Sequence, residues 1–170
     1  MKRAVCLLMI LCLLGSACAC GKDTSAEPVR FFYLRNPDRY HYGSAEGVVS
    51  SEERDASGHT SDVKYLLTLY LQGPVDEMLR SPFPADLKLL DLTRRENNLY
   101  ITLNSTFLSL KGMDLTLACV CLARTSFSLV DVQAVHIQVS SAEGQISLVK
   151  TISINSLLLE DNDFTEANDN

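Results

Sequence analysis

The segment from Gly112 to Thr125 constrains the fold most, because its apolar side chains run nearly all the way round a helix. Asp114 and Arg124 bracket the segment, which is far shorter than the roughly 20 apolar residues that a transmembrane helix needs. A helix that is apolar on every side is stable in water only when it is buried. We therefore expect a helix that packs against a sheet, or partly against another subunit.

An amphipathic helix is expected directly after Ser61 and Asp62, which supply a capping hydroxyl and an acidic group in the first turn. Gly73 and Pro74 end it, because glycine accepts the left-handed conformation after a helix and proline cannot continue the helix. Between these signals, one continuous face is apolar. Its residues are Val63, Leu66, Leu67, Tyr70 and Leu71.

Short segments rich in β-branched and aromatic residues predict strands on either side of these helices. The clearest are residues 99–103 and 130–139, in which apolar and polar side chains alternate and predict one buried face. Residues 87–93 precede the first of them across Asn97 and Asn98, which suit the positive φ angles of a hairpin turn. Further strands are expected at residues 29–34, around Val48 and Val49, and at residues 146–149.

The first twenty residues have the order of a secretory signal peptide. Two basic residues precede an apolar run from Ala4 to Leu14, and small residues then surround Cys18 and Cys20. A cysteine directly after small residues is typical of a bacterial lipobox, whose thiol is diacylated before cleavage. We predict a lipoprotein signal peptide over residues 1–19 and lipidation at Cys20, with Cys18 as the alternative site. An ordinary signal peptide followed by a free thiol is the other interpretation.

The expected mature chain divides into a polar spacer, one domain and an acidic tail. Residues 20–28 are short and unpatterned, residues 29–159 are long enough for a single domain with its own core, and residues 160–170 contain acidic but no basic side chains. Removing residues 1–19 leaves 13 basic against 21 acidic residues, a net charge of −8. This charge argues against nucleic acid or anionic lipid as a partner.

The sequence contains no recognisable pattern of catalytic or metal-binding residues. The three histidines are far apart and interpreted as surface residues, so we expect no metal, no cofactor and no enzyme. Cys119 and Cys121 lie two residues apart in the apolar segment, where helical side chains point to different sides, and they are interpreted as buried thiols. The acidic residues between positions 46 and 55 are interpreted as a solvated loop.

Aromatic residues concentrate in one part of the chain, at Phe31, Phe32, Tyr33, Tyr40 and Tyr42. Packing in the core is one interpretation of this group. The other is a partner surface, because aromatic side chains combine large contact area with a polar tip. We therefore consider these five residues a candidate surface for a protein partner or a sugar.

Six segments carry a resemblance to a known family: Tyr70 to Pro74, Ser81 to Pro84, Leu87 to Leu92, Leu99 to Ser105, Arg124 to Phe127 and Val132 to Val139. Through them, residues 63–140 resemble the GerMN domain, a module of spore germination and sporulation lipoproteins. The resemblance implies an α+β fold, in which two helices pack on one face of a small mixed sheet, as in the ring-building modules of envelope assemblies. Two features depart from the family pattern. Residues 123–126 replace the usual leucine-rich run at the end of the second helix, and Ser140 and Ser141 stand where a glycine usually follows the last strand.

The anchor and the family resemblance together predict a non-catalytic lipoprotein on the extracytoplasmic face of the bacterial cytoplasmic membrane. The resemblance implies a structural, assembly or protein-interaction role in sporulation, spore germination or cell-envelope organisation. The expected partner is an envelope protein or a second copy of the chain. The alternative hypothesis is a module that binds cell-wall polysaccharide or a small ligand, with the aromatic residues between positions 31 and 42 as its platform.

Overall fold

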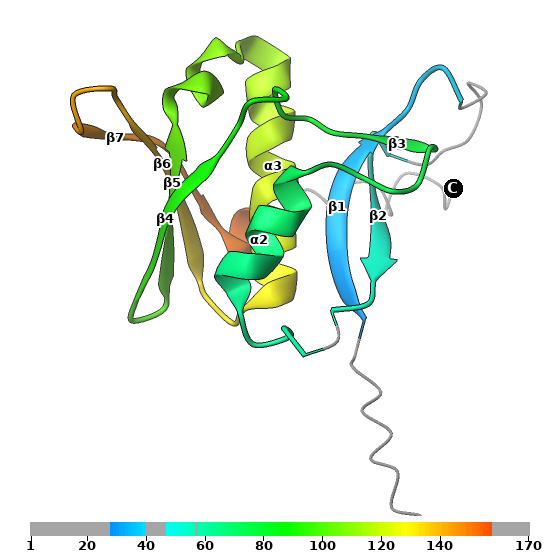
Figure 1. Cartoon of the computed structure of the whole chain (residues 1–170), viewed down its shortest axis with the longest axis horizontal. Helices are drawn as coiled ribbons and strands as arrows, with labels where there is room; N and C mark the ends of the chain where they lie inside the picture. Colours follow the sequence, from blue (N-terminus) through cyan, green and yellow to red (C-terminus); the bar gives the residue numbers. More distant parts are fainter. Residues whose placement is uncertain (1–27, 40–46, 57, 158–170) are drawn as a thin grey trace, which may run out of the picture.

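Two β-sheets enclose two helices in the computed structural model, which describes residues 28–39, 47–56 and 58–157 (Figure 1). None of the helices within these ranges is long and apolar enough to cross a membrane. The elements follow in the order β1 (Val29–Arg35), β2 (Val49–Arg54), α2 (Val63–Leu71), β3 (Leu79–Arg80), β4 (Leu89–Arg95), β5 (Asn98–Asn104), the short 3-10 helix η1 (Ser105–Ser109), α3 (Gly112–Leu129), β6 (Ala134–Ser140) and β7 (Ile146–Ser153).

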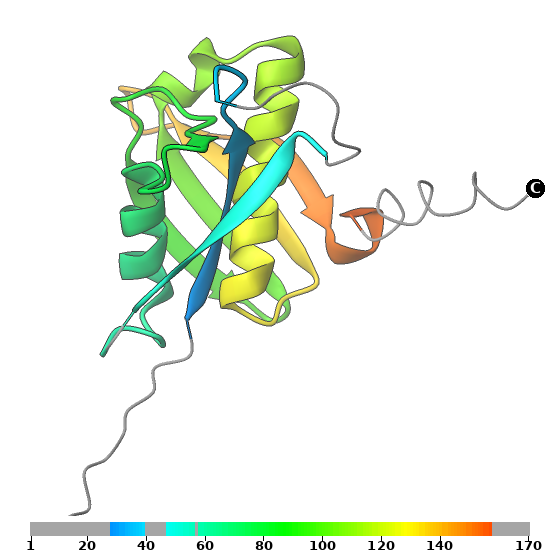
Figure 2. The same cartoon turned by 90° about the vertical axis from the view of Figure 1, so that its right-hand side faces the viewer.

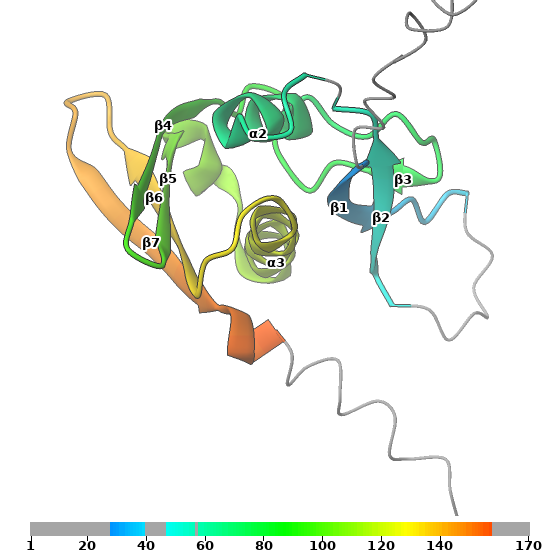
Figure 3. The same cartoon turned by 90° about the horizontal axis from the view of Figure 1, so that it is seen from below.

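The larger sheet is mixed and has the strand order β4-β5-β6-β7. β5 and β6 are parallel, and α3 provides the crossover connection that parallel neighbours require, whereas the other pairs are antiparallel. The parallel register places Leu99 beside Val135 and Ile101 beside Ile137, and these side chains are buried on one face. Both helices pack on this inner face, which confirms the predicted α+β fold (Figure 3).

A second sheet, with the strand order β2-β1-β3, covers the opposite side of α3 (Figure 2). The sequence did not indicate that the opening strands form a sheet of their own. This sheet explains why α3 is apolar nearly all round, because one side of the helix faces β6 and β7 and another faces β1 (Figure 3). The apolar helix is therefore buried between two sheets of its own chain.

α3 extends beyond its predicted end at Thr125, and two hydrogen bonds satisfy the polar side chains at this point, one from β1 and one within the helix. The Thr125 side-chain oxygen accepts a 2.9 Å hydrogen bond from the Phe32 backbone N–H, and the Ser126 hydroxyl donates to the Leu122 carbonyl at 2.7 Å. Both polar side chains are fully buried, so these bonds satisfy groups that would otherwise be costly to bury. The helix consequently continues to Leu129, one turn further than sequence reasoning placed it.

The predicted amphipathic helix is confirmed as α2, although its cap differs. The Asp62 carboxylate, rather than the Ser61 hydroxyl, caps the helix by accepting a 3.0 Å hydrogen bond from the Tyr65 backbone N–H. Gly73 follows the helix with a φ of 99°, the left-handed conformation for which glycine was expected. In the predicted hairpin between β4 and β5, the positive φ of 53° belongs to Glu96 and not to the asparagines at 97 and 98.

The acidic residues expected in a solvated loop lie partly in β2. The Glu52 carboxylate accepts hydrogen bonds of 3.0 Å from the backbone N–H groups of Val75 and Asp76, and it forms an ion pair with Arg54. The Arg54 guanidinium also donates to the Gly73 carbonyl at 2.5 Å. This largely buried pair therefore fastens the segment after α2 to the smaller sheet.

Candidate interaction surface

The predicted aromatic surface at residues 31–42 is not supported by the described side chains. Phe31 and Tyr33 point into the core and are 0% exposed, and Phe32 is half-buried beneath the Arg124 guanidinium. Tyr40 and Tyr42 lie outside the described residues, as do Cys18 and Cys20. The prediction was wrong for Phe31 and Tyr33 because alternate residues of β1 face α2 and α3.

Hydrogen bonds fix the buried tyrosines in the core. The Tyr33 hydroxyl donates to the Tyr70 carbonyl at 2.8 Å, and the Tyr70 hydroxyl donates to the Phe32 carbonyl at 2.7 Å. Burial raises the pKa of both phenols above the usual value, so they remain protonated. With Phe31 and Phe83 they form the core aromatic cluster, in which ring centroids lie 4.9 to 5.5 Å apart.

The two cysteines of the domain are buried free thiols, as expected. Burial raises the pKa of Cys119 to about 11 and that of Cys121 to about 12. Because the thiolate is the reactive form of cysteine, neutral thiols of this kind are weak nucleophiles near pH 7. Their positions on α3 therefore support packing rather than chemistry. Among the described residues, no group of three or more potential metal ligands comes together.

The outer face of the larger sheet carries a different aromatic group. Alternation in β5 places Leu99 and Ile101 inward and Tyr100 outward, and the parallel register places His136 of β6 beside Tyr100. The two rings stack with centroids 4.4 Å apart and an interplanar angle of 9°. No described element covers this face of the sheet (Figure 1, Figure 3).

Polar contacts extend this stack across all four strands. The Arg95 guanidinium of β4 lies 5.4 Å from the Tyr100 ring centroid, a cation–π arrangement. His136 Nδ1 lies 2.9 Å from the Thr151 hydroxyl of β7, and Nε2 lies 3.4 Å from the Asn98 side-chain oxygen. Arg95, Tyr100, His136 and Thr151 form what we term the cross-strand row. Both ring nitrogens of the histidine have partners, so the row is held in one orientation.

A hollow of about 200 Å³ adjoins the row. Thr102 and Gln138 form its floor with a 3.5 Å hydrogen bond, and Asp91 lies at its β4 side. Ile146 and Leu148 of the edge strand β7 are 60% and 59% exposed beside these polar groups. A half-buried aromatic ring beside an exposed guanidinium, flanked by aliphatic side chains, is the composition that protein interfaces favour at their centre.

Sequence reasoning interpreted His136 as an isolated surface residue and did not single out Arg95 or Tyr100. The outward position of Tyr100 followed from the alternation in residues 99–103. Its pairing with His136 did not, because the parallel register depends on how α3 crosses the sheet.

Fold and surface together define a small α+β domain whose candidate site is an exposed sheet face. The family model "Germane: Sporulation and spore germination" matches residues 31–145. The chain therefore belongs to this family, and the resemblance to the GerMN domain is confirmed. No curated protein matches the sequence.

Two solved structures match this chain at low sequence identity, and the first of them supports the fold. The tandem GerMN domains of the sporulation protein GerM from Bacillus subtilis match with a TM-score of 0.50 and 18% identity, over 74% of this chain and 44% of that chain. This chain thus spans less than half of the GerM structure. A "Putative Lipoprotein from Clostridium perfringens" matches with a TM-score of 0.45 and 16% identity, over 76% of this chain and 89% of that chain.

Proposed function

We propose that this chain is a membrane-anchored, non-catalytic lipoprotein that binds another protein through the outer face of its larger sheet. Its role belongs to sporulation, spore germination or cell-envelope organisation, in keeping with its family. The observation that carries the proposal is the cross-strand row, an ordered Arg–Tyr–His arrangement on a bare sheet face. The partner is an envelope protein or a second copy of the chain.

The side chains of the cross-strand row are already held in fixed positions, which supports a binding role. Association costs free energy when side chains must be immobilised, about 0.5–1.5 kcal/mol for each flexible side chain. The His136 ring is held by Thr151 and Asn98, and its stack in turn positions Tyr100. Tyrosine and arginine are also the residue types that contribute most often to binding energy at interfaces.

The buried reactive groups support a non-catalytic role. The thiols of Cys119 and Cys121 and the phenols of Tyr33 and Tyr70 are the groups whose pKa values are raised, and all four lie in the core. Their pKa shifts follow from burial in packed, hydrogen-bonded positions. Such shifts stabilise the neutral form and do not prepare a nucleophile.

Substitution of the row tests the binding role. The tagged, lipidated chain is cross-linked in intact cells of its host, and the captured partner is compared between the parent and the Tyr100→Ala variant. Tyr65→Ala is a matched control, because Tyr65 is an exposed tyrosine that also stacks on a histidine, His59, but lies on α2. We expect Tyr100→Ala alone to lose the partner. Retention of the partner by Tyr100→Ala would refute the proposal.

The anchor is tested separately from the surface. Residues 20–28 would hold the domain within about 30 Å of a lipidated Cys20, since an extended chain spans at most about 3.6 Å per residue. We expect the double variant Cys18→Ala, Cys20→Ala to leave the membrane fraction and Cys119→Ala to remain in it. A membrane-bound double variant would contradict the lipid anchor without affecting the proposal for the sheet face.

A further inference from the structure

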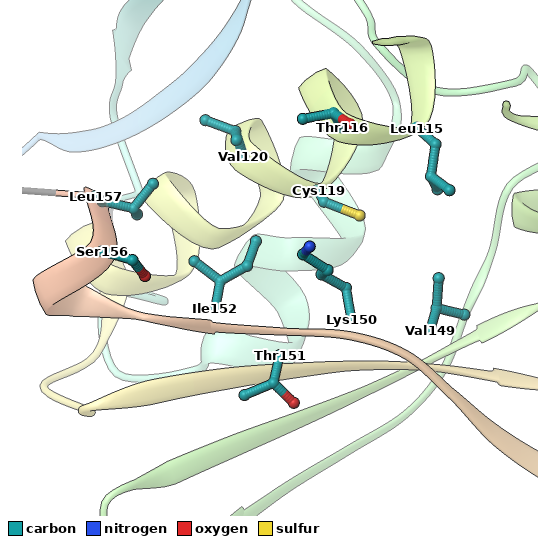
Figure 4. Close-up of a pocket in the computed structure, with 10 residues that line it drawn as sticks. All are labelled: Leu115, Thr116, Cys119, Val120, Val149, Lys150, Thr151, Ile152, Ser156 and Leu157. Atoms are coloured by element: carbon teal, nitrogen blue, oxygen red, sulfur yellow. The ribbon is translucent and has the colours of Figure 1, made fainter. Parts of the chain in front are cut away.

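A groove of about 400 Å³ separates α3 from β7, on the opposite side of β7 from the cross-strand row. Figure 4 shows that side chains from both elements converge on it. Its volume lies within the usual range of small-ligand sites, about 300–1,000 Å³. The apolar residues that line it are Leu115, Cys119, Val120, Val149, Ile152 and Leu157.

A bulge in β7 adds a positive charge to this apolar groove. Ile137 pairs with Lys150 and Gln138 pairs with Leu148, so Val149 is an extra residue on the β7 side. An extra residue of this kind, a β-bulge, changes the side of the strand to which the neighbouring side chains point. Val149 packs against the core, Lys150 lines the groove, and Thr151 points to the other side of the strand (Figure 4).

The Lys150 ammonium points toward the interior of the groove. In Figure 4 its Nζ atom and the Cys119 Sγ atom both point into the space between helix and strand. Burial raises the pKa of the Cys119 thiol to about 11, and the nearby Lys150 charge acts in the opposite direction. Among the described residues, Lys150 is the one charged side chain that lines the groove, and it is exposed, so a bound anion can reach it.

We propose that the groove binds a single-chain aliphatic carboxylate. The alkyl chain lies on the apolar floor between Leu115 and Ile152, where it is removed from water. The carboxylate pairs with the Lys150 ammonium, as opposite charges in partly desolvated positions attract. The aliphatic floor fits a hydrocarbon chain, and the single cation fits one carboxylate. Thr151 belongs both to the groove lining and to the cross-strand row, but its side chain points away from the groove (Figure 4). The proposal does not depend on the proposed protein-binding function.

Calorimetric titration with decanoate and with 1-decanol tests both parts of the proposal. The chain from Gly21 onward is used, because it contains every residue of the core. Decanoate should bind below its micelle-forming concentration and more tightly than 1-decanol. Lys150→Met, which retains an aliphatic side chain, should weaken decanoate binding about two- to fivefold and leave 1-decanol binding unchanged, an effect consistent with an exposed charge pair.

Two further variants separate charge and groove effects. Lys64→Met removes an exposed lysine from α2, outside the groove. This variant should bind decanoate and 1-decanol with the same affinities as the parent. Leu115→Asn places a polar side chain on the apolar floor and should weaken the binding of both decanoate and 1-decanol about tenfold. The proposal is overturned if decanoate does not bind, or if Lys150→Met and Lys64→Met behave alike. It is also overturned if removal of residues 158–170 strengthens decanoate binding tenfold, because the chain itself would then occupy the groove.

Discussion

The core aromatic cluster and the cross-strand row contain similar residue types in opposite environments. In the cluster, Tyr33 and Tyr70 are completely buried and their hydroxyls bind backbone carbonyls. In the row, Tyr100 and His136 stack closely but keep one side toward solvent. Part of the cluster is contiguous in sequence at residues 31–33, whereas the row joins residues from four separate strands. Concentration of aromatic residues along the chain therefore did not identify the exposed aromatic surface.

Strand register, rather than proximity in sequence, brings together the residues of the exposed surface. β1 lies between β2 and β3 and also packs on α3, so its alternate aromatic side chains are needed inside. β5 packs against the core with one face only, so Tyr100 is free to point outward. If this distinction is correct, substitutions in the cluster should affect stability, and substitutions in the row should affect binding.

The largest expected effect is on the stability of the core variant. Tyr70→Ala removes a fully buried ring and leaves the Tyr33 hydroxyl network with an empty space beside it. Truncation of a buried aromatic side chain costs about 3–5 kcal/mol. Denaturant unfolding should show a loss of this size. Tyr70→Phe, which removes one hydrogen bond and keeps the ring, should lose about 1–2 kcal/mol. Equal losses of stability in Tyr70→Ala and Tyr70→Phe would show that the Tyr70 hydroxyl, and not the packing of its ring, stabilises the core.

Alkaline pH should destabilise the core through its buried thiols. The folded pKa of Cys119 is raised from 9.0 to about 11, so the unfolded state releases its proton first as the pH rises. The stabilisation is complete below pH 9 and is lost progressively up to pH 11. At about 1.4 kcal/mol per pKa unit, the free energy of unfolding that is lost through Cys119 as the pH rises is of the order of 3 kcal/mol. Denaturant unfolding at several pH values should show that Cys119→Ala loses less free energy of unfolding between pH 9 and 11 than the parent does. The same pH dependence in both proteins would contradict the raised pKa of Cys119.

The smallest expected change in stability belongs to the row. Tyr100→Ala removes a half-exposed ring that stacks on His136 and Arg95, and cross-strand pairs contribute only about 0.2–1 kcal/mol. The free energy of unfolding of this variant should therefore lie within about 1 kcal/mol of that of the parent. A loss as large as that of Tyr70→Ala would assign the row to the structural core and would remove the contrast between the two aromatic groups.

Most individual elements were predictable because their signals are local. The apolar face of α2, its Gly-Pro end and the alternation in β5 and β6 each involve neighbouring residues, and the structure confirms them. The extent of α3 was underestimated because Thr125 and Ser126 are poor helix formers. In the structure, Thr125 accepts a hydrogen bond from β1, and the Ser126 hydroxyl donates to the Leu122 carbonyl within the helix. The smaller sheet was not predicted, since its third strand, the two-residue β3, follows α2 in the sequence and lies far from β1, with which it pairs.

The candidate site was less predictable than the fold. The interpretation of Phe31 and Tyr33 as a surface failed because residue type alone does not show whether a strand is covered on both sides. The row could not be assembled without the parallel register that brings Tyr100 to His136. The groove required the bulge at Val149, which redirects Lys150 and leaves no signal in the sequence.

Site-specific photo-crosslinking in intact cells tests whether a partner protein binds to the outer face of the larger sheet. One photoreactive residue replaces Gln138, which lies on the outer sheet face beside the row, and another replaces Lys64, which is exposed on α2. The account predicts a protein adduct from position 138, lost when Tyr100→Ala is added, and no corresponding adduct from position 64. An adduct from position 64 with none from position 138 would show that the partner binds elsewhere.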